Sequence, residues 1–173
     1  MELKTLYREI LNEHNINPAH KAEMPEASVT LRGVNPSCGD DITLFLKTED
    51  GKITDGSFTG SGCAISQASV DMMLDRIIGK DETEALRLAD NFMAMIQGTA
   101  TQEQIDSLDE AGALQDIAHM PARVKCAVLG WRTMTEMLRT GTQTARAGNA
   151  HCASGGVLPP PHESAQGDVQ PLA

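Results

Sequence analysis

The sequence predicts an α+β domain, in which a helix comes first, three strands follow, and more helices complete the chain. Between residues 29 and 58, apolar and polar residues alternate, as they do along half-buried strands. After residue 63, apolar residues recur at intervals of three and four, which is the spacing of one helix face. With 173 residues, the chain is most simply one domain with a sizeable core.

The first half of the chain contains the expected sheet. A helix is predicted over residues 3–14, and a polar connector with two prolines follows it. The first strand includes Val29 and Leu31, the second covers residues 42–47, and the third covers residues 53–58. Asp50-Gly51 separates the last two strands, and both residue types tolerate the positive φ that a tight hairpin requires.

The second half is predicted to be helical. Glycines end the helices expected over residues 63–78 and 82–97, and a capping box at Thr101–Gln104 starts a third, over residues 102–118. This third helix is acidic, which indicates a solvated face or, alternatively, a docking surface for a partner. A last helix starts at Pro121 and ends at Gly141. We therefore expect a domain over residues 1–141 and a disordered tail over residues 142–173.

Charge and hydropathy exclude several classes of function. The net charge of -10 argues against a protein that binds nucleic acid or an anionic membrane surface. No apolar run reaches the roughly 18 residues of a membrane span, and the first residues do not resemble a signal peptide. A cytoplasmic location is expected, where cysteines stay reduced and indicate metal binding or catalysis before disulfides.

One loop and two helix starts carry the candidate chemistry. The loop of residues 35–40 places Cys38 and Asp40 two residues apart, on either side of a glycine. Cys63 follows a Gly-Ser-Gly bend where a helix begins, and Cys126 lies in the first two turns of the last helix. Three thiols and one carboxylate provide the four donors of a tetrahedral zinc site. We therefore hypothesise that these four residues converge on one metal ion.

Each donor also has a structural interpretation. A single cysteine is most often a small buried hydrophobe, and an aspartate in a loop usually caps a helix or faces solvent. The gaps of 25 and 63 residues between the three cysteines match no zinc finger. Arg123 and Lys125 either offset the negative charge of a metal–thiolate centre or are ordinary solvated cations. Cys152 and the five histidines fit no ligand spacing, and we expect them at the surface or at helix caps.

Three segments together resemble a known family, the iron–sulfur cluster assembly proteins of IscU/SufU type, which include the NifU N-terminal domain. The segments are Asn35-Pro36-Ser37-Cys38-Gly39-Asp40, Gly60-Ser61-Gly62-Cys63-Ala64-Ile65-Ser66 and Pro121-Ala122-Arg123-Val124-Lys125-Cys126. They occur in the family's order, and the resemblance covers about residues 3–140. It implies the SufE/IscU-like α+β fold, a small three-stranded antiparallel sheet with helices packed on one side.

Two features favour the SufU branch. Lys125 stands where the IscU branch has a histidine, and the segment between Cys63 and Cys126 is longer than in that branch. The resemblance then implies that Cys38, Asp40, Cys63 and Cys126 bind zinc, with Arg123 and Lys125 as supporting residues. It also implies that Cys38 is the catalytic thiol, which receives persulfide sulfur from a SufS-type cysteine desulfurase. A downstream cluster scaffold such as a SufB-type protein is the implied recipient.

Two other functions remain open. The same ligands suit a non-enzymatic scaffold that builds a [2Fe–2S] cluster, and a structural zinc protein is a third possibility. Lys125 favours the sulfurtransferase over the scaffold, while an aspartate ligand argues against a purely structural site. Because four protein ligands leave no open position, one must leave before reaction. Cys38, beside flexible Gly39, is the expected leaving ligand, with a donor from the partner replacing it.

Overall fold

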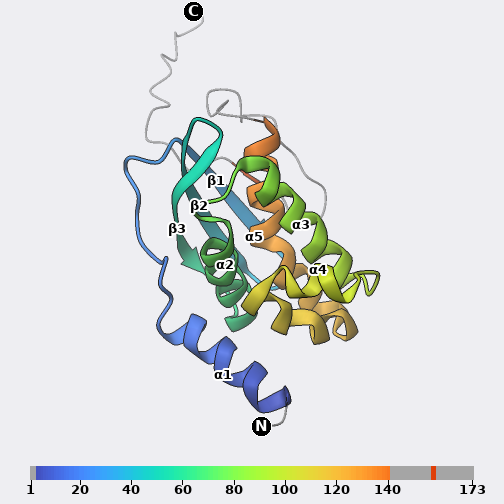
Figure 1. The fold of residues 1–173 in the computed structure, drawn as a ribbon. Coiled ribbons are helices and arrows are strands. Elements are labelled where there is room, and N and C mark those ends of the chain that lie inside the picture. The colour runs from blue at the N-terminus through green and yellow to red at the C-terminus, as the bar shows by residue number, and fades with distance from the viewer. Residues whose placement is uncertain (1–2, 141–156, 159–173) are drawn as a thin grey trace, which may run out of the picture.

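The computed structural model describes residues 3–140 and 157–158, and its centre is an antiparallel sheet (Figure 1). The strands are β1 (Val29–Asn35), β2 (Asp40–Glu49) and β3 (Lys52–Ser61). They pair antiparallel in the order β3-β2-β1, so the predicted three-stranded sheet is confirmed. The turn between β2 and β3 has Asp50 and Gly51 at positive φ, 52° and 75°, as the hairpin signal predicts.

A short strand extends the sheet beyond β1. β4 (Val157–Leu158) pairs antiparallel with Gly33 and Arg32 of β1. These two residues belong to the segment 142–173 that we expected to be a disordered tail, so the pairing is a feature that the sequence did not predict. The other residues of that segment, Cys152 among them, lie outside the described residues, and the proposed domain boundary stays a prediction.

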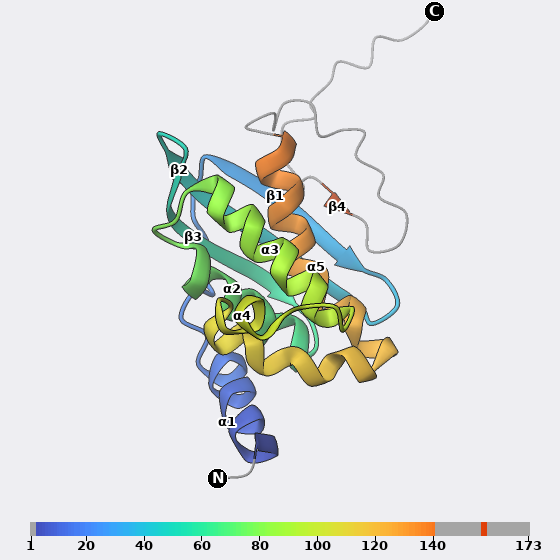
Figure 2. The same ribbon diagram turned by 45° about the vertical axis from the view of Figure 1, so that its right-hand side comes forward.

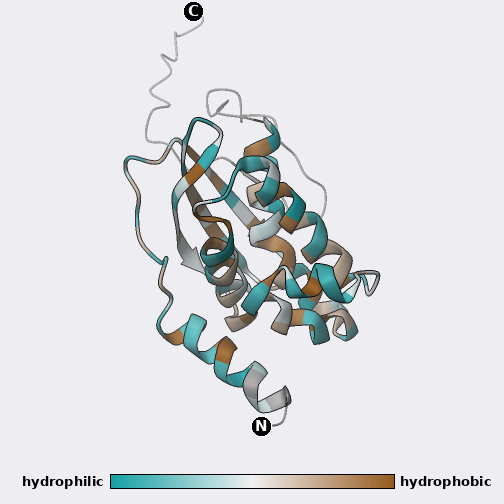
Figure 3. Cartoon of the chain, in the orientation of Figure 1, coloured by the Kyte–Doolittle hydropathy of each residue, from teal (hydrophilic) through white to brown (hydrophobic). Residues whose placement is uncertain are grey.

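Helices cover one face of the sheet (Figures 1 and 2). After α1 (Leu3–Ile16), the chain forms the strands and then α2 (Ala64–Ile77), α3 (Glu82–Ile96), α4 (Gln102–Asp106), the 3₁₀ segment η1 (Asp109–His119) and α5 (Pro121–Thr140). Along α1 and α3, hydrophilic and hydrophobic stretches alternate, as expected for helices with one buried face (Figure 3). In the described part of the chain, every helix is too short or too polar to span a bilayer.

The segment predicted as a single helix over residues 102–118 is in fact two elements. α4 begins at the predicted capping box, with the Thr101 hydroxyl accepting from the backbone of Gln104, but it ends after five residues. Asp109 then takes a positive φ of 53°, which an α-helix cannot continue through. From the residue before Asp109 onward, the buried hydrophobic residues recur every three residues, the repeat of a 3₁₀ helix: Leu108, Ala111, Leu114 and Ile117.

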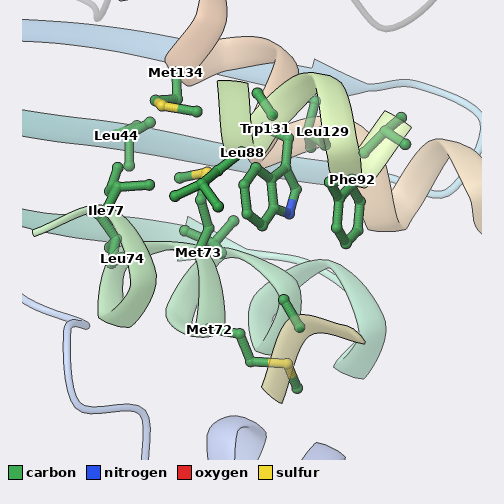
Figure 4. Close-up of a cluster of buried hydrophobic side chains, with 14 of the residues drawn as sticks. Leu44, Met72, Met73, Leu74, Ile77, Leu88, Phe92, Leu129, Trp131 and Met134 are labelled. Carbon is green, nitrogen blue, oxygen red and sulfur yellow. The ribbon is translucent and has the colours of Figure 1, made fainter. Parts of the chain in front are cut away.

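The core lies between the sheet and the helices that cover it (Figure 4). Trp131 of α5 stacks on Phe92 of α3, with ring centroids 4.5 Å apart. The indole N–H donates to the hydroxyl of Ser69, which donates in turn to the backbone carbonyl of Ala127 at 2.7 Å. This chain of hydrogen bonds joins α2 to α5. It therefore fixes the relative position of the two helices that carry Cys63 and Cys126.

The N-terminal helix is held by a buried histidine. His14 is 8% exposed, and its Nδ1 and Nε2 lie 2.7 Å from Asp71 and 2.8 Å from Glu110. The prediction that His14 is a surface or cap residue is therefore wrong, because it bridges α2 and η1. His20 bonds Asp75, His119 is exposed, and the two remaining histidines lie outside the described residues.

Candidate metal centre

Three of the four predicted donors lie together at one end of the sheet. One ligand atom each from Cys38, Asp40 and Cys126 lies within 4.8 Å of the others, and the Sγ atoms of Cys38 and Cys126 are 3.1 Å apart. Cys38 comes from the turn after β1, Asp40 is the first residue of β2, and Cys126 lies in the second turn of α5. Figure 2 shows the turn between β1 and β2 beside the start of α5.

Cys63, the fourth predicted donor, lies next to this group with its sulfur engaged locally. It is the N-cap residue of α2, and its Sγ accepts from the backbone N–H of Ser66 at 3.4 Å. Its own backbone N–H donates to Asp40 Oδ1 at 2.8 Å. The structure thus places Cys63 beside Asp40 at a helix start, as predicted, but its sulfur is not part of the three-donor group.

Asp40 is the most firmly held of the four donors. It is completely buried, and both carboxylate oxygens accept hydrogen bonds. Oδ1 accepts from the Cys63 backbone and from the hydroxyl of Ser66 at 3.1 Å, while Oδ2 accepts from Nδ2 of Asn35 at 3.3 Å. A buried carboxylate with this many partners is a fixed part of the site. The solvated role considered from the sequence is therefore wrong, whereas a capping role is retained in part, because Oδ1 accepts from the N-cap residue of α2.

Asn35, Ser66 and Gly62 are site residues that sequence reasoning missed. Asn35 is 1% exposed, and its Nδ2 lies 3.6 Å from the Cys126 sulfur as well as close to Asp40. A Cβ atom on Gly62 would lie 2.4 Å from Ser66 Oγ and 2.8 Å from Asp40 Oδ1, so this position leaves no room for a side chain. All three occur within the segments of the family resemblance, which was the signal that could have identified them.

The donors differ sharply in their access to solvent. Cys38 is exposed and Cys126 is fully buried. Arg123 and Lys125, the predicted supporting residues, are exposed on α5, and neither forms an ion pair within residues 3–140. Asp41, next to the site, pairs with Arg32 through Nε at 2.8 Å, which holds the pKa of the Asp41 carboxyl below its usual range.

The electrostatics of the centre favour a cation. Burial raises the pKa of the Cys126 thiol, and its contacts with Cys38, Asp40 and Cys63 raise that pKa further. The Cys126 thiol thus lies in surroundings that disfavour its ionisation. A bound metal ion would reverse this effect and hold the thiols as thiolates. Sulfur-rich donors of this kind fit zinc or an iron–sulfur cluster better than magnesium or calcium.

A second group of possible ligands, His14, Asp75 and Glu110, also lies within 4.8 Å. Both ring nitrogens of His14 already have carboxylate partners, so hydrogen bonding accounts for this cluster without a metal. The cysteine-containing group is therefore the stronger candidate.

Curated relatives show which family of proteins this chain resembles. The iron–sulfur cluster assembly scaffold protein IscU of Thermotoga maritima is 40% identical over 139 residues, which cover 80% of this chain and 96% of that protein. The zinc-dependent sulfurtransferase SufU of Bacillus subtilis is 40% identical over 132 residues, covering 76% of this chain and 88% of that protein. The two names describe different roles, and the identities do not separate them.

Solved structures agree with the sheet and helices described above. One of them, a protein of Fervidobacterium islandicum AW-1 described as an iron–sulfur cluster assembly scaffold for the SUF system, is 35% identical. It superposes with a TM-score of 0.72, covering 78% of this chain and 97% of the other. The family model of the NifU-like N terminal domain matches residues 6–127, which include all four predicted donors. The resemblance seen in the sequence is thus confirmed, and the chain belongs to the NifU-like N-terminal domain family of iron–sulfur cluster assembly proteins.

Proposed function

We propose that this protein is a zinc-dependent sulfurtransferase, which takes sulfur from a SufS-type cysteine desulfurase for iron–sulfur cluster assembly. The observation that carries the proposal is an exposed residue, Cys38, whose sulfur lies 3.1 Å from that of buried Cys126 and within 4.8 Å of a carboxylate oxygen of buried Asp40. A site with only a structural role would not need one sulfur at the surface. The name of the Bacillus subtilis relative supports the same activity.

The donors that would hold zinc are Cys38, Asp40, Cys63 and Cys126. When bound, zinc keeps thiols deprotonated near neutral pH and has no redox activity of its own. Asp40 and Cys126 are anchored by burial and hydrogen bonds, and Cys63 caps α2 within reach of Asp40. Arg123 and Lys125 are proposed to offset negative charge at the rim.

Cys38 is the residue best placed to attack. It lies in a turn beside Gly39, whose φ of 72° is typical of glycine, and within the described residues its sulfur forms hydrogen bonds only with Cys126 and the backbone carbonyl of Ala122. The Cys38 thiolate attacks the terminal sulfur of the desulfurase persulfide. The partner's sulfur–sulfur bond breaks, a new one forms on Cys38, and the partner cysteine leaves as a thiolate, so no external oxidant or reductant is needed.

The other two cysteines of the centre are less suited to attack the persulfide. Cys126 is fully buried, and the Cys63 sulfur accepts a hydrogen bond at the start of α2. A thiolate held by a metal is also a poor nucleophile, so Cys38 must be released from the centre before it reacts. We expect the desulfurase to supply a replacement donor, most simply a histidine.

A scaffold for a [2Fe–2S] cluster is the second candidate. The Thermotoga maritima relative, equally identical to this chain, is named a scaffold protein, and cysteine thiolates are the usual ligands of such clusters. Lys125, in place of the histidine of the IscU branch, favours the sulfurtransferase. If the protein is a sulfurtransferase, a SufB-type protein is the proposed recipient of the sulfur.

Metal content and stimulation of a desulfurase distinguish the two candidates. The sulfurtransferase should be purified with about one zinc per chain and should accelerate the turnover of a SufS-type desulfurase on cysteine. Cys38→Ser should fold, keep part of its zinc and lose the stimulation, whereas Cys126→Ser should lose both. Iron with acid-labile sulfide in place of zinc, together with no stimulation, would support the scaffold.

A further inference from the structure

We propose that Asn35 is a positioning residue of the metal centre, whose side-chain amide holds Asp40 and Cys126 in place for the ion. The inference rests on the proposed zinc site. Asn35 is the last residue of β1 and pairs directly with Asp40 across the ladder to β2. Its Nδ2 atom lies 3.3 Å from Asp40 Oδ2 and 3.6 Å from Cys126 Sγ.

The chemistry of an amide group suits this position. The –NH₂ group of asparagine has two hydrogens, so one can point to the carboxylate and the other to the sulfur at the same time. It is uncharged, so it can donate to both ligand residues without competing with a bound cation. A serine could donate only one hydrogen, and a lysine would compete with the ion by its own charge.

The fold alone does not require this side chain. Asn35 Oδ1 is buried and has no hydrogen-bond partner within the described residues, which destabilises the folded state. The turn that follows uses the backbone carbonyl of Asn35, which accepts from Cys38 N at 3.2 Å, and any residue could provide it. The Asn35 side chain leaves Oδ1 unpaired, while its Nδ2 contacts two predicted ligands. Orienting those two ligands explains why asparagine stands at this position.

Asn35 should matter most while Cys38 is away from the centre. During sulfur transfer, Asp40, Cys63 and Cys126 are the ligands of this chain that remain on the zinc beside the partner's donor, and Asn35 contacts two of them. The amide therefore supports the part of the ligand set that stays in place. Its loss should weaken zinc binding more in a protein that lacks the Cys38 sulfur than in the wild type.

The test compares wild type, Asn35→Leu and Val34→Thr. Leucine has the same branched arrangement of four side-chain heavy atoms as asparagine without its donors, and Val34 is a half-buried neighbour on β1 that makes none of these contacts. Zinc affinity is measured by competition with a chelating dye, and thiolate-to-cobalt charge-transfer bands are recorded after Co²⁺ substitution. Asn35→Leu should bind zinc about 10- to 100-fold more weakly, the usual effect of losing an outer hydrogen bond to a ligand, with altered charge-transfer bands. Val34→Thr should stay within about twofold of the wild type.

Urea unfolding of the zinc-free proteins separates positioning from a structural role. Zinc-free Asn35→Leu loses the hydrogen bond to the buried Asp40 carboxylate together with the unpaired Oδ1, and these two effects have opposite signs, so its urea midpoint should stay close to that of the zinc-free wild type. If Asn35→Leu does not fold, Asn35→Ser replaces it and should give an intermediate loss of affinity. In the Cys38→Ser background, the loss of affinity from Asn35→Leu should be larger than in the wild type.

The outcomes distinguish this inference from the proposed function. A wild type that binds one zinc tightly, with Asn35→Leu equally tight and spectroscopically unchanged, would overturn the inference and leave the sulfurtransferase proposal standing. An equal or smaller loss in the Cys38→Ser background would also overturn it. A wild type that binds no zinc would contradict both.

Discussion

Substituting Gly62 by alanine should weaken zinc binding although it replaces none of the four predicted ligands. The new Cβ would lie 2.4 Å from Ser66 Oγ and 2.8 Å from Asp40 Oδ1, where ordinary contacts begin at 3.4 Å. Ser66 must turn away by about 1 Å, which breaks its hydrogen bond to the Asp40 carboxylate. A hydrogen bond to a charged group contributes about 1.5–3 kcal/mol, and overpacking of this kind costs about 1–3 kcal/mol.

We therefore expect Gly62→Ala to lower the free energy of unfolding by about 3 kcal/mol, near the lower end of the summed costs, which corresponds to about 6–12 °C in melting temperature. Zinc affinity should fall at least about tenfold, because Asp40 loses one of the groups that orient it. Gly98→Ala is the matched control. Gly98 follows α3 at a φ of +74° with no atom near its hypothetical Cβ, so alanine there costs about 1–2 kcal/mol in backbone strain alone.

The assay is urea unfolding together with zinc competition for both variants. The control should lose stability and keep its zinc affinity, whereas Gly62→Ala should lose both. If Gly62→Ala binds zinc as tightly as Gly98→Ala, the close packing of Gly62 against Ser66 and Asp40 does not orient Asp40 for zinc.

Three further predictions concern zinc, pH and the C-terminal segment. Removing zinc with a chelator should lower the melting temperature, since an ion bound only by the folded state stabilises it; an unchanged melting curve after verified removal would contradict this. Burial lowers the pKa of His14, but hydrogen bonds with Asp71 and Glu110 outweigh it and raise that pKa above its usual value. The stabilisation from His14 should thus be complete below about pH 6.5 and be lost as the pH rises through the raised pKa. The difference in melting temperature between wild type and His14→Gln should therefore narrow from pH 6 to 9. A constant difference would contradict the stabilising role of protonated His14. Deleting residues 142–173 should leave zinc binding and desulfurase stimulation intact, because the family match ends at residue 127, and loss of either would show that the segment takes part.

The elements that the sequence predicted correctly are those with local signals. Asp50-Gly51 marks a hairpin, Thr101 and Gln104 form a capping box, and Pro121 begins the last helix, and each signal lies within four residues. The 3₁₀ segment was missed because its buried residues repeat every three positions, and a short run of that spacing also fits an α-helix. The end of α4 follows from the positive φ at Asp109, which the residue type permits but does not require.

The donors themselves were predicted from their type and from the resemblance, but the groups that orient them were not. The contact between Asn35 and Cys126 joins residues 91 positions apart, and the one between His14 and Asp71 joins residues 57 apart. Such pairs depend on how α1, α2 and α5 pack against the sheet and against one another. No periodicity in a single sequence contains that information. The bridge from Arg32 to Asp41 was missed for the same reason, since it depends on strand register.

Mass spectrometry after reaction with a SufS-type desulfurase and cysteine shows directly which cysteine receives the sulfur. We expect one additional sulfur atom on Cys38, the exposed cysteine of the centre, in the wild type and in the protein lacking residues 142–173. Cys38→Ser should acquire none. Additional sulfur on Cys63, Cys126 or Cys152, with Cys38 unmodified, would contradict the proposed role of Cys38.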